Sequence, residues 1–196
     1  MQTRFDPRLN REIMEIYPGE LHASRDPCVI STVLGSCVSV ALHDSVNGIG
    51  GMNHFMLPGR LGQEKIYVSN AGKYGMFAME LLINEMIKMG AKKRAMIAKV
   101  FGGGKVLKAL LGASGNVADS NVSFAMEFLS EEGIPVSSSD VGGTLGRRIL
   151  FFTEDARVLL KRLSYIQDIP LVLDEDKYLT RLQKQKEEKK GRVTLF

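Results

Sequence analysis

Three short apolar runs between residues 28 and 57, separated by tight turns, constrain the fold of this 196-residue chain most strongly. Residues 28–33 and 37–42 are rich in β-branched and small apolar side chains, and a third run covers residues 52–57. The residues that end the runs are turn formers: Leu34-Gly35-Ser36, Asp44 to Gly48, and Pro58-Gly59. The pattern therefore predicts three consecutive short strands.

Hydrophobic periodicity in the rest of the chain predicts two helices and further strands. Apolar residues recur at helical spacing from Tyr74 to Met89, after a cap at Ser69 or Asn70, and again from about residue 119 to 129. Further strands are predicted at residues 94–100, 134–136, 148–152 and 157–160. Because strands outnumber helices and do not alternate strictly with them, the expected fold class is α+β, with mixed β-sheets and two main helices.

The chain is expected to divide into three parts. Residues 1–27 are interpreted as an N-terminal approach segment, because Pro7, Pro18 and Pro27 interrupt any regular element. Residues 28–173 form the main domain. Residues 174–196 form a charged C-terminal tail with seven Lys/Arg and five Asp/Glu, which is compatible with a frayed helix, a disordered end or an electrostatic handle.

Composition excludes several classes of protein. Two cysteines cannot staple a chain of this length, and no segment approaches the roughly 18 apolar residues of a membrane span. The net charge of +4 suggests a protein that binds nucleic acid. However, half of this charge lies in the tail, and acidic and basic residues are interspersed in the rest of the chain. The N-terminus lacks the apolar core of a signal peptide. We expect a cytoplasmic protein with reduced thiols, no nucleic-acid partner and no membrane insertion.

Cys37 is the main candidate for chemistry because it follows a Gly-Ser turn between two apolar strands. Gly35 permits a sharp bend there, which can present both a thiol and free backbone N–H groups. A free cysteine is only a few per cent thiolate at pH 7, so a nucleophilic role needs a neighbouring base. His54 is the candidate base, and strand alternation places it on one face with Met52 and Met56.

Structural alternatives accompany each of these residues. Free cysteines are usually inert packing, which is the interpretation for Cys28 and an open alternative for Cys37. His22 and His43 are interpreted as surface or capping residues. The sequence gaps within the set Cys28, Cys37, His43 and His54 do not resemble those of structural zinc sites.

Two other motifs remain without a defined ligand. Residues 102–105 read Gly-Gly-Gly-Lys but lack the other residues of a P-loop, so this loop either approaches a ligand or makes a tight turn. The methionine-rich helix expected at residues 74–89 is interpreted as core.

The segments Thr32-Val33-Leu34-Gly35-Ser36-Cys37-Val38 and Gly51-Met52-Asn53-His54-Phe55-Met56-Leu57-Pro58 resemble the CheD family of bacterial chemoreceptor glutamine deamidases. Further matches follow in the family's order: Lys73-Tyr74-Gly75, Ala98 to Gly104, Asn121-Val122, Asp140 to Gly143, and Gly146-Arg147. The resemblance spans about residues 20 to 162 and implies a layered, cysteine-hydrolase-like domain at residues 28–173.

The resemblance also implies a site. A cysteine and a histidine act with a hydroxyl residue six positions before the cysteine, which points to Cys37, His54 and Ser31 as catalytic residues. Thr32 is the neighbouring alternative to Ser31, and alternation allows only one of them to reach the histidine. His54 would take the thiol proton, the thiolate would attack a glutamine carboxamide, and N–H groups near Ser36 and Cys37 would stabilise the oxyanion.

The implied reaction needs no cofactor and no metal. The implied partners are methyl-accepting chemotaxis receptors and a CheC-type phosphatase, and the implied location is the cytoplasm, at chemoreceptor arrays. Two alternatives stay open, namely a non-catalytic chemotaxis module that regulates a CheC-type phosphatase, and an unrelated cysteine hydrolase or transglutaminase.

Overall fold

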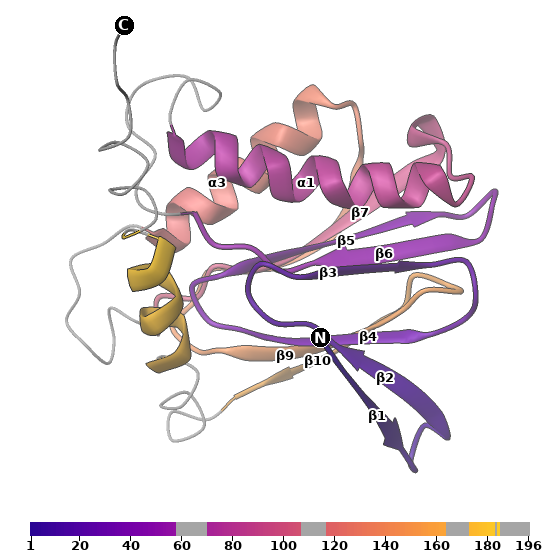
Figure 1. The fold of residues 1–196 in the computed structure, drawn as a ribbon, viewed down its shortest axis with the longest axis horizontal. Helices are drawn as coiled ribbons and strands as arrows, with labels where there is room; N and C mark the ends of the chain where they lie inside the picture. The colour runs from indigo at the N-terminus through magenta and orange to yellow at the C-terminus, as the bar shows by residue number, and fades with distance from the viewer. Residues whose placement is uncertain (58–69, 107–116, 164–172, 183, 185–196) are drawn as a thin grey trace, which may run out of the picture.

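The fold is known from a computed structural model that describes residues 1–57, 70–106, 117–163, 173–182 and 184 (Figure 1). Two mixed five-stranded sheets and the helices beside them form a layered α+β fold, which confirms the expected class. The first sheet has the order β1 (Gln2–Asp6), β2 (Arg11–Glu15), β4 (Val29–Leu34), β9 (Arg147–Phe152), β10 (Val158–Arg162). The second has the order β3 (Leu21–Ser24), β6 (Ile49–Asn53), β5 (Val38–Asp44), β7 (Met96–Gly102), β8 (Val136–Val141).

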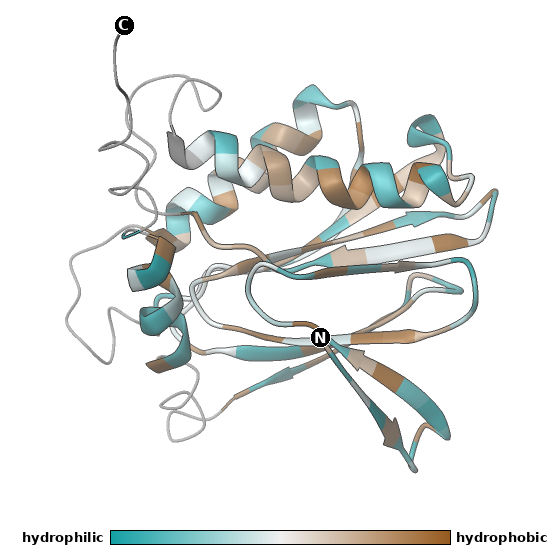
Figure 2. Cartoon of the chain, in the orientation of Figure 1, coloured by the Kyte–Doolittle hydropathy of each residue, from teal (hydrophilic) through white to brown (hydrophobic). Residues whose placement is uncertain are grey.

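The two predicted helices cover one face of the second sheet. Helix α1 (Asn70–Lys88) contacts β3 and β6, and α3 (Val117–Glu131) contacts β5 and β7 (Figure 1). Hydrophobic and hydrophilic stretches alternate along both helices in Figure 2, as expected for elements with one buried face. One buried cluster, which includes Phe55, Met86 and Phe124, belongs to this layer. A second cluster, which includes Ile30, Met52 and Cys37, combines residues of both sheets.

The three strands predicted at residues 28–57 are present as β4, β5 and β6, but they do not form one hairpin series. β4 belongs to the first sheet, whereas β5 and β6 pair in the second. The turn at residues 35–37 therefore carries the chain from one sheet to the other. β6 begins and ends earlier than predicted, so His54 lies just after it. Beyond β6 the pairing continues through the isolated Val38–Phe55 bridge and through backbone hydrogen bonds of His54 with Gly19 and Glu20.

The expectation that prolines exclude regular structure from residues 1–27 is wrong. The prolines lie between strands rather than within them, in the connections that follow β1, β2 and β3. Proline has no N–H to donate to a sheet, but a connection between strands does not need that hydrogen bond. Strands can therefore form before and after each proline. β2 pairs in parallel with β4 and β3 pairs with β6, so the segment adds strands to both sheets.

Candidate active site

The turn at residues 35–37 is held rigidly through its carbonyl groups. Gly104 N–H donates to Gly35 O at 2.6 Å, and Gly103 N–H donates to Cys37 O at 2.7 Å. Asn121 Nδ2 donates to Ser36 O at 2.8 Å, while its Oδ1 accepts from the N–H of Leu57. All three carbonyl groups of the turn therefore accept a hydrogen bond from the glycine loop or from Asn121. The N–H groups of the turn take no part in these bonds. The glycine loop predicted at residues 102–104 serves as this support.

The three N–H groups of the turn converge on one anion. Gly35 N and Cys37 N lie 2.9 and 3.2 Å from Oε1 of Glu175, and Ser36 N lies 2.8 Å from its Oε2. The Ser36 hydroxyl also donates to Oε2, at 2.6 Å. A Cβ at position 35 would lie 2.6 Å from Val106 Cγ2 and 2.7 Å from Oε2, so only glycine allows this approach. Successive N–H groups aimed at one point form an anion-binding nest.

Cys37 and His54 lie on the same face of the second sheet. The Val38–Phe55 bridge places Cys37 diagonally across from His54, a distance that longer side chains can span. The alternation predicted for this run is confirmed, because Met52 and Met56 join the same buried cluster as Cys37 while Phe55 joins the other. No hydrogen bond joins Cys37 to His54, whose Nε2 is buried and has no hydrogen-bond partner among the described residues.

The hydroxyl that contacts His54 belongs to Thr32. Thr32 Oγ1 lies 2.7 Å from His54 Nδ1 and donates to Ile16 O at 2.8 Å. Because the hydroxyl has one proton and gives it to a carbonyl, His54 Nδ1 must be the donor to Thr32, which leaves a lone pair on Nε2. This tautomer is the one that a general base needs.

Ser31, the residue expected to contact the histidine, does not do so. Its Oγ is buried and finds no hydrogen-bond partner in the described part of the chain. The reason is strand alternation. Ile30 and Leu34 point into the cluster between the sheets and place Thr32 there with them, whereas Val29 packs in a separate cluster and shares its face with Ser31. The prediction of Ser31 as the partner of His54 is therefore corrected to Thr32.

Burial keeps both candidate catalytic groups uncharged. Burial lowers the pKa of His54 from 6.5 to about 3, so its imidazole is neutral near pH 7. Burial, and then the nearby Glu175 carboxylate, raise the pKa of the Cys37 thiol well above its usual value. Within the part of the chain that the structure describes, no positive charge near the thiol favours its ionisation.

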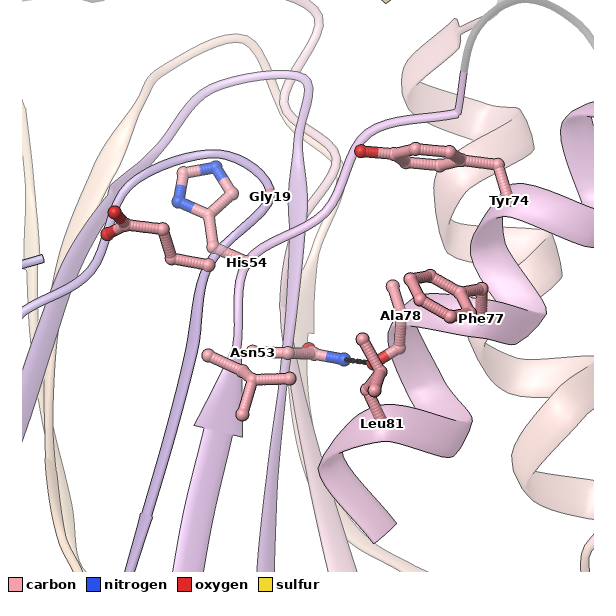
Figure 3. Close-up of a pocket in the computed structure, with 9 residues that line it drawn as sticks. Gly19, Asn53, His54, Tyr74, Phe77, Ala78 and Leu81 are labelled. Carbon is pink, nitrogen blue, oxygen red and sulfur yellow. Dashed lines mark hydrogen bonds between the residues drawn. The ribbon is translucent and has the colours of Figure 1, made fainter. Parts of the chain in front are cut away.

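A pocket adjoins His54 on the side that faces α1 (Figure 3). Its wall is formed by Tyr74, Phe77, Ala78 and Leu81 from the helix, and by Asn53 and residues 19–21 on the other side. Figure 3 shows Asn53 reaching across to α1, where its Nδ2 donates to Ala78 O at 3.2 Å. Phe77 is 61% exposed, so an aromatic side chain stands at the edge of the pocket.

The remaining cysteine and histidines lie apart from this arrangement. Cys28 is half-buried, packs against the cluster between the sheets and contacts Thr153 Oγ1 at 3.7 Å, in line with a packing role. His22 is half-buried on β3, but His43 is 6% exposed on β5, so the expectation of a surface position is wrong for His43. Within the described ranges no three His, Cys, Asp or Glu side chains are grouped to hold a metal ion.

The sequence interpretation missed three residues that build the site. Asn121 and Arg147 had been noted only as parts of motifs, yet Asn121 supports the turn and Arg147 binds the carbonyls of Gly102 and Asp140 at 2.6 and 2.8 Å. Glu175 was assigned to the charged tail. The apolar residues Tyr178, Leu179 and Leu182 have the spacing of one helix face, which indicates a helix in this segment but not the burial of Glu175.

Comparisons with known proteins agree on one family. The family model "CheD chemotactic sensory transduction" matches residues 56–162, a stretch that begins after Cys37 and His54. A Laribacter hongkongensis protein named "Probable chemoreceptor glutamine deamidase CheD" is 42% identical over 93% of this chain and 87% of its own. A protein of the same name from Methylobacillus flagellatus is 41% identical over 98% of this chain and 93% of its own.

A search of solved structures finds a weaker likeness. The crystal structure of the Bacillus licheniformis hypothetical protein YfiH aligns with a TM-score of 0.39 and 14% identity, over 61% of this chain and 49% of that one. None of the described helices is long and apolar enough to cross a membrane. The matches along the sequence are the decisive ones, and by them this chain belongs to the CheD family.

Proposed function

We propose that this protein is a deamidase that converts glutamine side chains of chemoreceptors to glutamates, with Cys37 as nucleophile and His54 as base. The observation that carries the proposal is the nest of three N–H groups beside Cys37, which holds a side-chain carboxylate. A group that binds a carboxylate there can also bind the oxyanion that forms when a carboxamide is attacked. The names of the relatives supply the substrate class.

The reaction proceeds in two acyl-transfer steps. His54 Nε2 accepts the Cys37 proton, and the sulfur attacks the carboxamide carbon, so that the carbonyl oxygen becomes an oxyanion bound by the turn. Protonated His54 returns its proton to the nitrogen, ammonia leaves, and a thioester remains. Water then gives a proton to His54 and its hydroxyl to the thioester carbon, which releases glutamate and the thiol. Thr32 holds His54 in the tautomer that both steps need.

Cys37 and His54 must approach each other for the first step, since no hydrogen bond joins them here. The diagonal placement puts the two residues on one sheet face, and we expect rotation of the two side chains to bring them together.

Two further parts of the proposal rest on the family resemblance alone. They are a CheC-type phosphatase as a second partner, and a cytoplasmic location at receptor arrays. A non-catalytic module that regulates such a phosphatase is the competing function, and it would not require Cys37.

Mass spectrometry of receptor cytoplasmic fragments distinguishes these functions. Fragments incubated with wild-type protein should gain the mass of an amide-to-acid conversion at specific glutamines, while Cys37→Ala and His54→Ala should leave them unchanged. Cys28→Ala is the matched control and should keep the activity. Conversion that persists with Cys37→Ala would refute the mechanism, and no conversion by wild type on cognate receptors would favour the non-catalytic module.

A further inference from the structure

The segment expected to be a charged tail contains a helix that packs on the candidate active site. Residues 173–182 are helical, and this is the yellow helix at the left of Figure 1. Glu175 and Leu182 are buried, Tyr178 and Leu179 are partly buried, and the other residues of the helix are exposed. One face is thus covered, and Tyr178 and Leu179 pack against the cluster that contains Cys37.

Among the residues that the structure describes, Glu175 makes its hydrogen bonds only with the Cys37 turn. Four donors bind its carboxylate, namely three backbone N–H groups and the Ser36 hydroxyl, and the side chain is 1% exposed. Among the described residues no Lys, Arg or His forms an ion pair with it. A buried carboxylate is costly unless hydrogen bonds satisfy it, so this nest is a site built for an anionic or oxyanionic group.

A second contact joins the helix to α1 and to Gly19. Tyr178 Oη lies 2.6 Å from Tyr74 Oη on α1 and packs closely against Gly19, where a Cβ would come within 2.6 Å of it. Gly19 and Tyr74 also line the pocket beside His54 (Figure 3). The helix therefore bridges the nucleophile turn and the pocket at the same time.

We propose that Glu175 occupies the nest as an intramolecular product analogue, so that residues 173–182 close the active site until a substrate displaces them. This inference rests on the proposed deamidase function, because a glutamate side chain is the product that the reaction would release. A carboxylate accepts hydrogen bonds at both oxygens, whereas a carboxamide accepts at one, so the nest fits the glutamate better than a glutamine. The occupied turn also accounts for the complete burial of Cys37.

The proposal makes residue 175 itself a potential substrate. In Glu175→Gln the carboxamide is placed against the turn by the same helix. Cys37 attack on that carboxamide carbon would release ammonia and form an internal thioester, and water would then restore glutamate at position 175. Purified full-length Glu175→Gln should therefore carry glutamate or a thioester at residue 175 by peptide mass spectrometry, and the double variant Glu175→Gln/Cys37→Ala should retain glutamine.

Failure of this inference can be separated from failure of the proposed function. If Glu175→Gln keeps its glutamine while the same preparation deamidates receptor fragments, the product-analogue inference is wrong and the deamidase stands. If neither residue 175 nor any receptor glutamine is converted, the deamidase proposal itself fails.

Thiol labelling tests closure of the site without any substrate. In the full-length protein we expect iodoacetamide to label Cys37 at least tenfold faster in Glu175→Ala than in wild type, with Cys28 as the internal reference. Asp176→Ala is the matched control, because Asp176 is an exposed acidic residue of the same helix, and it should label like wild type. Receptor deamidation should rise severalfold in Glu175→Ala. Equal labelling of Cys37 in wild type and both variants would overturn the inference.

Discussion

The chemistry of His54 depends on the single proton of the Thr32 hydroxyl. That proton goes to Ile16 O, so the imidazole donates through Nδ1 and keeps a lone pair on Nε2. Ser31 lies one residue away but on the opposite face of β4, where its hydroxyl cannot perform this role. At this scale, function follows from which side of a strand a hydroxyl occupies.

Substitutions at Thr32 and Ser31 distinguish the roles of these two neighbouring hydroxyl residues. Thr32→Val keeps the side-chain shape but removes the partner of His54, and we expect it to lower kcat for receptor deamidation by roughly tenfold or more, part of the 10²–10⁴ that a positioned base contributes. Thr32→Ser should restore most of the rate, because it returns the hydroxyl. Ser31→Ala should change kcat far less. Steady-state kinetics that show an equal loss in Ser31→Ala and Thr32→Val would contradict this assignment.

The low pKa of His54 gives the protein a pH-dependent stability. The pKa is about 3 when folded and 6.5 in the reference state, so on acidification the unfolded chain binds a proton that the folded chain does not. The stabilisation is complete above pH 6.5 and is lost as the pH falls toward 3, by up to about 1.4 kcal/mol per pH unit.

Denaturant unfolding at pH 7 to 5 measures this loss. The free energy of unfolding of His54→Gln should fall less steeply on acidification than that of wild type. The difference between the two slopes against pH should approach the value for the uptake of one proton on unfolding. His22 and His43 titrate in both proteins and cancel in the comparison. Parallel slopes would show that His54 is solvated in the folded state.

Among the elements, the loop that follows β7 determines the shape of the nucleophile turn. Gly102 has φ +112°, and a Cβ there would lie 2.2 Å from Cys37 O, a backbone atom that cannot move aside. The next two glycines donate the hydrogen bonds that hold the turn. The backbone of this loop therefore contacts the backbone of the nucleophile turn directly, and only glycine leaves room for such close contact.

Gly102→Ala tests this support, with Gly142→Ala as the matched control. Both glycines have positive φ, but a Cβ at Gly142 meets nothing within 4 Å. We expect both variants to lose about 1 kcal/mol of stability from backbone strain, and Gly102→Ala to lose roughly 1–3 kcal/mol more from the clash. Thermal unfolding gives these values. Deamidase activity should fall in Gly102→Ala and persist in Gly142→Ala, so similar activity in both would contradict the proposed support.

For the whole molecule, Arg147 connects the ends of both sheets. It stands on β9 of the first sheet, is fully buried, and binds Gly102 O and Asp140 O at the end of the second sheet. It also binds Gly142 O and lies 3.3 Å from the Asp140 carboxylate. These bonds hold together the loops that support the Cys37 turn.

Arg147→Met should destabilise the fold, whereas Arg148→Met should not. Loss of Arg147 removes the donors that its fully buried guanidinium gives to the carbonyls of Gly102, Asp140 and Gly142, and we expect a cost of about 3 kcal/mol in denaturant unfolding. Arg148 is more exposed and pairs with Glu15 at 3.2 Å, a surface ion pair for which the expected cost is under about 1 kcal/mol. Equal costs for the two variants would show that the hydrogen bonds of Arg147 add little to the stability of the fold.

Local patterns in the sequence are sufficient to predict the α+β class, most strands, both long helices, the turn before Cys37, and the face that His54 shares with Met52 and Met56. These features depend on local propensity and alternation, which neighbouring residues specify. Three features depend on the tertiary fold: Thr32 contacts His54, residues 1–27 contribute strands to both sheets, and Glu175 lies in the nest although it is 138 residues away from Cys37. A charged residue in a charged segment has the local signature of a solvated surface. Its burial depends on four donors brought together by the fold, and no local pattern encodes them.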